Sequence, residues 1–132
     1  MGSTSISVGI QWTPPGSAAN SGNSTLTSVG TENSQSVGKI DIPAATVAPA
    51  TYVVPFGSVS AAKTVIIQNL MSTEIGVRLN GAVADNFTLG AGQTFIISGP
   101  VAGTTVPITA ASVLTTDAPT EVEYVNFWIF GD

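Results

Sequence analysis

The sequence predicts an all-β fold: an antiparallel two-sheet β-sandwich with an extended Gly/Ser-rich N-terminal arm. A jelly roll is one arrangement of the strands that the sequence leaves open for this sandwich. Three observations predict the sandwich. Apolar and polar residues alternate in short segments, which is the period of strands buried on one face. The 14 Gly and 8 Pro residues interrupt these segments, and no stretch keeps a helical period. About eight short strands at such spacing are typical of a sandwich.

The first expected strand covers residues 5–12, where Ile6, Val8, Ile10 and Trp12 fall on one face. The following TPPG ends it, because proline cannot donate a hydrogen bond to a ladder. We therefore expect Trp12 to face the core.

Residues 16–38 are rich in Gly, Ser, Asn and Thr, and their only sizeable apolar residues are Leu26, Val29 and Val37. Such a segment buries too little surface to offset the entropy of ordering it, so alone it is predicted to be a flexible arm, which either the rest of its own domain or a neighbouring subunit holds in place. The chain is accordingly divided into a strand and arm at 1–38 and a sandwich domain at 39–132.

The remaining strands are predicted from alternation between turn residues. Two hairpins are expected, one from 63–70 with 74–80 and one from 86–89 with 93–98. Asn80-Gly81 is the strongest short turn signal, since both residues tolerate positive φ. The other expected strands are 39–43, 50–56, 106–113 and 121–130.

The chain has no Cys and no His, which excludes thiolate sites, disulfides and histidine bases. Its eight acidic residues could in principle supply a carboxylate pair for a small hydrolase, but solvated carboxylates are the favoured interpretation. Oxygen ligands such as Asp85, Asn86 and Asp117 do not follow the dense spacing of a calcium loop. We therefore predict a protein that is not an enzyme, with no catalytic residues, no metal and no cofactor.

Charged residues make up 8% of the chain, against about 25% in a typical domain. With a net charge of −5 and three cations, nucleic acid is not an expected partner. There is no apolar run of about 20 residues to span a bilayer and no basic signal region, so no membrane partner is expected. A surface this poor in charge is instead compatible with coverage by other protein chains.

The last strand, 121–130, is apolar on both faces from Val125 onward except at Asn126. One sandwich core covers only one face of a strand. We expect Tyr124, Trp128 and their neighbours to face the core. The other face is then covered either by another protein chain, which is the favoured interpretation, or by the N-terminal strand or arm folding back. The predicted partner-interface residues, with the apolar residues of the arm, are Val125, Phe127, Ile129, Leu26, Val29 and Val37.

Three segments, IPAATVAPATYVVPFGSVSAAKTVIIQNLMSTEIGVRLNG, FTLGAGQTFIISGPVAGTTVPITAASV and VEYVNFWIFGD, resemble small β-rich virion proteins of tailed bacteriophages. The resemblance covers roughly residues 42–132 and lies in overall texture and the terminal FGD. It implies a structural protein of the particle: a capsid decoration or cement protein, or a tail or head-fibre component. Such proteins have no catalytic residues.

The favoured function is thus a non-enzymatic cement protein that bridges capsomers on the outer capsid surface, with a tail position as the other location. Its expected partners are other copies of itself, with a trimer favoured, and the major capsid protein or another virion protein. The alternative is a glycan- or receptor-binding module of a tail or head fibre.

Overall fold

The structure is a computed structural model that describes residues 2–12, 22–32, 34–98 and 107–132, with side chains described for 34–97 and 107–132. These residues form ten strands and no helix, so none of them belongs to a helix that could cross a membrane. The strands are β1 (Gly2–Trp12), β2 (Gly22–Glu32), β3 (Ser34–Ile42), β4 (Thr51–Val53), β5 (Ala62–Asn69), β6 (Ile75–Leu79), β7 (Phe87–Leu89), β8 (Thr94–Ser98), β9 (Ala111–Thr115) and β10 (Glu123–Gly131).

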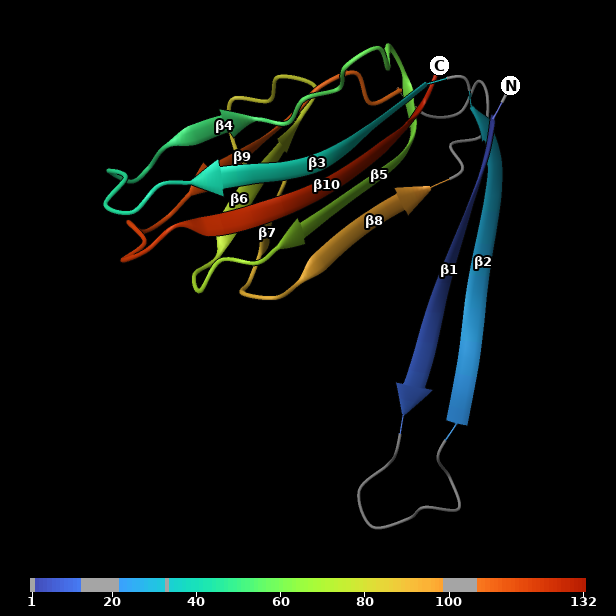
Figure 1. Cartoon of the computed structure of the whole chain (residues 1–132), viewed down its shortest axis with the longest axis horizontal. Coiled ribbons are helices and arrows are strands. Elements are labelled where there is room, and N and C mark those ends of the chain that lie inside the picture. The colour runs from blue at the N-terminus through green and yellow to red at the C-terminus, as the bar shows by residue number, and fades with distance from the viewer. Residues whose placement is uncertain (1, 13–21, 33, 99–106) are drawn as a thin grey trace.

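Eight strands form two antiparallel four-stranded sheets, as the sequence predicted. The first sheet has the order β3-β10-β5-β8 and the second β4-β9-β6-β7. Figure 1 shows the first sheet in front of the second, with β1 and β2 standing apart as a two-stranded ribbon. The predicted two-sheet β-sandwich is confirmed.

The pairing between strands is nested. β3 pairs with β10, β4 with β9, β5 with β8, and β6 with β7. This is the pairing of one long antiparallel hairpin rolled into two sheets, which is the arrangement of a jelly roll.

Both predicted hairpins are wrong because the chain changes sheet at each of the two connections. β5 belongs to the first sheet and β6 to the second, and the same crossing separates β7 from β8. Their alternation predicted the strands correctly, but pairing follows the roll rather than sequence proximity. The Asn80-Gly81 turn is confirmed: φ is 53° at Asn80 and 72° at Gly81, and the Ala82 N–H donates to the Leu79 carbonyl at 3.1 Å.

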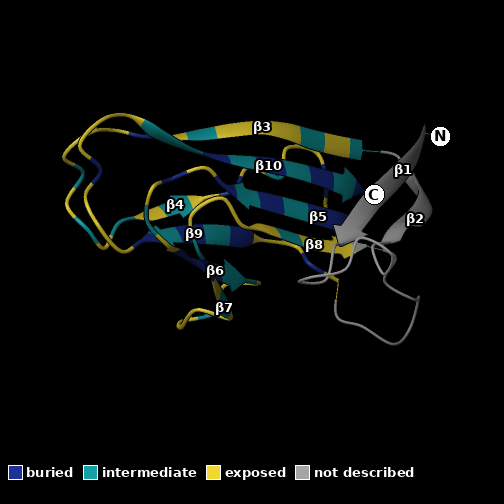
Figure 2. Cartoon of the chain, turned by 90° about the horizontal axis from the view of Figure 1, so that it is seen from below, coloured by how far each residue is buried: buried dark blue, intermediate teal, exposed yellow. Residues whose placement is uncertain are grey.

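The hydrophobic core lies between the two sheets. Buried residues alternate along β9 and along β10 from Val125, and nearly so along β5, which Figure 2 shows as dark blue bands on these strands. β-branched residues dominate, as expected for strands that pack face to face. The buried apolar residues of the central strands are Val65, Ile67, Ile75, Val77, Val113, Val125, Phe127 and Ile129.

The predicted flexible arm contains strands instead. β2 pairs with β1 over its whole length, and β3 begins at Ser34 and pairs with β10 as far as Ile42. The sandwich therefore uses residues on both sides of the boundary predicted at 38/39. Backbone hydrogen bonding in a ladder orders this segment even though it holds few apolar side chains.

Asn69 fixes the connection between β5 and β6. It is fully buried, and its Nδ2 amide lies 2.8–3.1 Å from the carbonyl oxygens of Thr73, Leu89 and Gly90. Its Oδ1 accepts the N–H of Met71 at 2.9 Å. One side chain thus satisfies buried backbone groups from two connections between the sheets.

Asn69→Leu is expected to lower the free energy of unfolding by about 3 kcal/mol, because buried backbone groups would lose their partners. Urea unfolding of purified protein measures the change. Gln68→Leu is the matched control: the Gln68 amide is half-buried and makes one long hydrogen bond, at 3.4 Å, so a much smaller change is expected. Equal losses in the two variants would contradict this role of Asn69.

Candidate interaction surface

The outward face of the first sheet carries an apolar row across all four strands. The strand register aligns Val37 of β3, Trp128 of β10, Ile66 of β5 and Ile96 of β8. Residues paired across antiparallel strands share a face, so these four side chains form one continuous line, here called the outer row. Val37 is 52% and Ile96 41% exposed, while Trp128 and Ile66 are half-buried.

The outer row has polar neighbours on the same face. The adjacent aligned residues are Lys39, Asn126, Gln68 and Thr94, and Asn126 Nδ2 lies 3.4 Å from Gln68 Oε1. An apolar centre with a polar rim is the common anatomy of a protein–protein interface.

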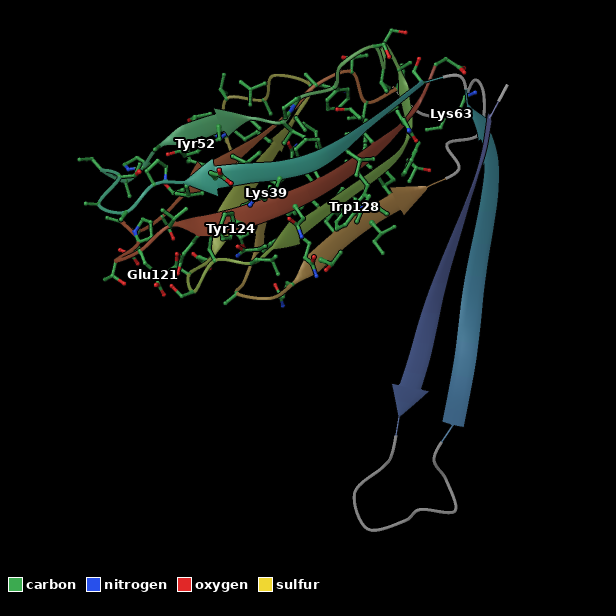
Figure 3. All side chains as sticks on the ribbon, in the orientation of Figure 1. Lys39, Tyr52, Lys63, Glu121, Tyr124 and Trp128 are labelled. Atoms are coloured by element: carbon green, nitrogen blue, oxygen red, sulfur yellow. The ribbon has the colours of Figure 1, made fainter. Side chains whose placement is uncertain are left out.

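Beyond that rim, β10 carries Tyr124, which lies on the same strand as Trp128 (Figure 3). The Lys39 ammonium is 4.2 Å from the centre of the Tyr124 ring and 3.8 Å from Asp41 Oδ1. The cation therefore has two partners on this face, an aromatic ring and a carboxylate.

Three predicted interface residues lie in the core instead. Val125 and Ile129 have no exposed surface and Phe127 is 4% exposed, so the prediction that they meet a partner is wrong. Gly38 makes room for the Phe127 ring, since a Cβ at position 38 would lie 3.1 Å from Cζ of Phe127. The prediction that Trp128 faces the core is also wrong. The face of β10 that packs in the core is the opposite of the expected one, so Trp128 points away from the core.

The glutamates at the start of the last segment explain this error. Glu123 lies on the same face of the strand as the core residues that follow it, and its charge predicted that this face is exposed to solvent. In the structure Glu123 is the first residue of β10, and its Oε2 accepts the N–H of Ser72 at 3.2 Å, in the connection after β5. The carboxylate therefore lies at the end of the sandwich, beyond the packed part of the strand.

The other predicted interface residues come from the N-terminal part of the chain. Val37 belongs to the outer row and is exposed, and its contact with a partner remains a prediction. Leu26 and Val29 lie in β2, whose side chains are outside the described part of the structure. Ile66 and Ile96 were missed. The consecutive apolar runs Val65–Ile67 and Phe95–Ile97 were the available signal, because such runs are apolar on both faces of a strand.

The β1–β2 ribbon is the second feature open to partners. Each strand has 11 residues, and β2 contacts the sandwich at β10. Figure 1 shows the ribbon extending away from the two sheets. An isolated two-stranded hairpin is at best marginally stable in water, so packing against another surface would stabilise this ribbon.

Two of the residues considered as oxygen ligands, Asp85 and Asn86, have structural partners. Asp85 Oδ1 accepts from Arg78 Nε at 2.7 Å, and Asn86 Oδ1 accepts the Leu79 N–H at 2.7 Å. Within residues 34–97 and 107–132, no three His, Cys, Asp or Glu side chains are grouped to hold a metal ion.

Comparison with protein-family models, curated proteins and solved structures finds no match to this chain.

Proposed function

We propose that this chain is a non-enzymatic structural protein of a bacteriophage virion, favoured as a decoration or cement protein on the outer capsid surface. The observation that carries the proposal is the outer row: an apolar line with a polar rim on a sheet face that the chain itself leaves partly exposed. Its partners would be other copies of the chain and the major capsid protein.

The architecture is compatible with this role. Jelly rolls recur in viral capsid domains and in lectins, although a fold alone does not establish a function. The argument therefore rests on the surface. Contiguous apolar residues exposed on a sheet face are typical of interaction sites, because soluble monomers rarely leave such patches open.

A role in bridging neighbouring proteins of the particle is also compatible with the two candidate contact surfaces of the chain. The outer row and the ribbon are separate features of one chain, so one copy can contact two neighbours. Contacts made together strengthen each other through effective concentration, so modest individual affinities suffice. The net charge of −5 disfavours adhesion to packaged nucleic acid.

The test is made on particles produced by the genome that encodes the chain. Mass spectrometry of purified particles is expected to find the protein in many copies. Particles from which the gene has been deleted are expected to release their DNA at a lower temperature, and added protein should restore the wild-type value. Absence of the protein from purified particles would contradict the proposal.

A glycan- or receptor-binding module of a tail or head fibre is the second candidate. The partly exposed Trp128 favours it, because the register places the amide residues Asn126 and Gln68 at the adjacent positions of the same sheet face, a combination suited to sugar rings. The apolar Val37, Ile66 and Ile96 around Trp128 suit protein contact better.

Glycan arrays separate the two functions. If the second candidate is correct, wild-type protein binds defined glycans and Trp128→Ala loses that binding while remaining folded. The cement proposal expects no glycan binding from either protein.

A further inference from the structure

The β1–β2 ribbon extends away from the two sheets, and the outer row is partly exposed on the first of them. We propose that the ribbon of one copy packs its apolar face on the outer row of a second copy. This inference rests on the self-assembly included in the proposed function. It specifies which surfaces meet.

The ribbon has one apolar and one polar face. Its register aligns Ile6 with Ser28, Val8 with Leu26 and Ile10 with Ser24. Paired residues share a face, so the alternating apolar residues of β1 fall on the face that includes Leu26.

The opposite face of the ribbon is polar. There the aligned pairs are Ser5 with Val29, Ser7 with Thr27, Gly9 with Thr25 and Gln11 with Asn23, with Val29 as the apolar exception. A ribbon with this asymmetry is suited to lie on an apolar surface with its polar face in water.

Folding the ribbon onto the outer row of its own chain is unfavourable while both strands stay paired. A single residue separates the end of β2 at Glu32 from the start of β3 at Ser34. Two Cα steps span at most about 7 Å, whereas stacked sheets lie about 10 Å apart. Folding back would break pairs at the end of β2 or the start of β3, so a second copy is the occupant that keeps the ladders intact.

The dimensions also match. Strands of 11 residues extend about 36 Å, and two strands cover a width of about 10 Å. On β10 and β5, whose nine and eight residues extend about 26–30 Å, one ribbon face buries about 550 Å² in total, and reciprocal exchange between two copies about 1,100 Å². Exchange around a ring of three copies would bury about 1,650 Å², which lies within the range of stable protein–protein interfaces, about 1,200–2,000 Å².

Cysteine cross-linking tests the exchange directly, because the full-length chain contains no cysteine. Two purified single variants are mixed: Val8→Cys, on the apolar face of the ribbon, and Ile66→Cys, in the outer row. A short bis-maleimide then joins cysteines that lie close together. One variant is isotope-labelled, so that mass spectrometry distinguishes a cross-link between the two variants from a cross-link between copies of one variant. The matched control replaces Val8→Cys with Ser7→Cys, on the opposite face of the same strand.

The exchange predicts that Val8→Cys gives at least about tenfold more cross-linked product with Ile66→Cys than Ser7→Cys gives. The reason is that two cysteines held together in an interface have a high effective concentration. Equal yields from both variants, or no mixed pair from either, would overturn it. A Val8→Cys/Ile66→Cys double variant that cross-links within one chain would also overturn it, because the ribbon would then cover its own sheet. None of these results depends on whether the protein is found in particles, so failure of the virion role is distinguished from failure of the exchange.

Discussion

Phe127→Ala is expected to lower the free energy of unfolding by about 3–5 kcal/mol, among the largest effects of any single substitution in this chain. The Phe127 ring is 4% exposed and packs under Gly38 of the neighbouring strand. Truncation removes buried apolar surface and leaves a cavity that the two sheets cannot fill. Urea unfolding followed by tryptophan fluorescence or circular dichroism measures the loss.

The adjacent Trp128 supplies the matched control for that substitution. Trp128→Ala removes a larger side chain, yet at protein concentrations low enough to keep the chain monomeric it is expected to cost less than Phe127→Ala, because the ring lies on the partly exposed outer face and its loss leaves no cavity between the two sheets. A Trp128→Ala variant as unstable as Phe127→Ala would contradict the assignment of the two faces of β10.

Gly131→Ala is expected to destabilise the fold by about 3 kcal/mol, at the upper end of the usual effect of overpacking. A Cβ at position 131 would overlap the carbonyl oxygen of Ala61. The backbone cannot easily withdraw, because the Asp132 carbonyl oxygen accepts the N–H groups of Ser60 at 2.6 Å and Ala61 at 3.1 Å. Thermal and urea unfolding of the variant give the loss.

Gly92→Ala separates the effect of crowding from that of losing a glycine. Gly92 has φ +75°, and nothing lies within 4 Å of a Cβ placed there. Its cost is therefore the conformational strain alone, about 1–2 kcal/mol. If Gly131→Ala proved no more destabilising than Gly92→Ala, the close approach between the end of β10 and Ala61 would be refuted.

The strands were largely predictable from the sequence because alternation and turn residues are local signals. The Ile75–Leu79 strand and the Asn80-Gly81 turn illustrate this, since each depends on residues a few positions apart. The pairing of strands was not predictable from the same signals. Whether β5 pairs with β6 or with β10 is decided by packing across the whole domain, which the nested ladders of the jelly roll determine.

The candidate surface was predicted on the correct strand but on the wrong face. From Val125 to Phe130 both faces of the last strand are apolar, so periodicity alone does not say which one is inside. Gly38, opposite Phe127 in the neighbouring strand, leaves space for the ring on the core side. The pairing of Gly38 with Phe127 joins residues far apart in the sequence, so it is known only once the register of the two strands is known.

The strands at residues 22–32 and 34–42 were likewise not predictable from amino-acid composition. A Gly/Ser-rich segment has little to bury, and its low apolar content predicted an arm. Ladder pairing of β2 with β1 and of β3 with β10 supplies the order instead.

The most direct test of the account is the mass of the purified protein in solution, measured by light scattering for wild type and two matched variants. Val37→Glu places a charge in the outer row, and Val83→Glu places the same charge at a residue that is 94% exposed in the connection after β6. Wild type and Val83→Glu are expected to form the same oligomer, and Val37→Glu to have the 13.3 kDa mass of a single chain. A wild-type protein that stays a single chain at all concentrations, or a Val37→Glu variant that keeps the wild-type mass, would contradict the claim that the outer row is an assembly surface.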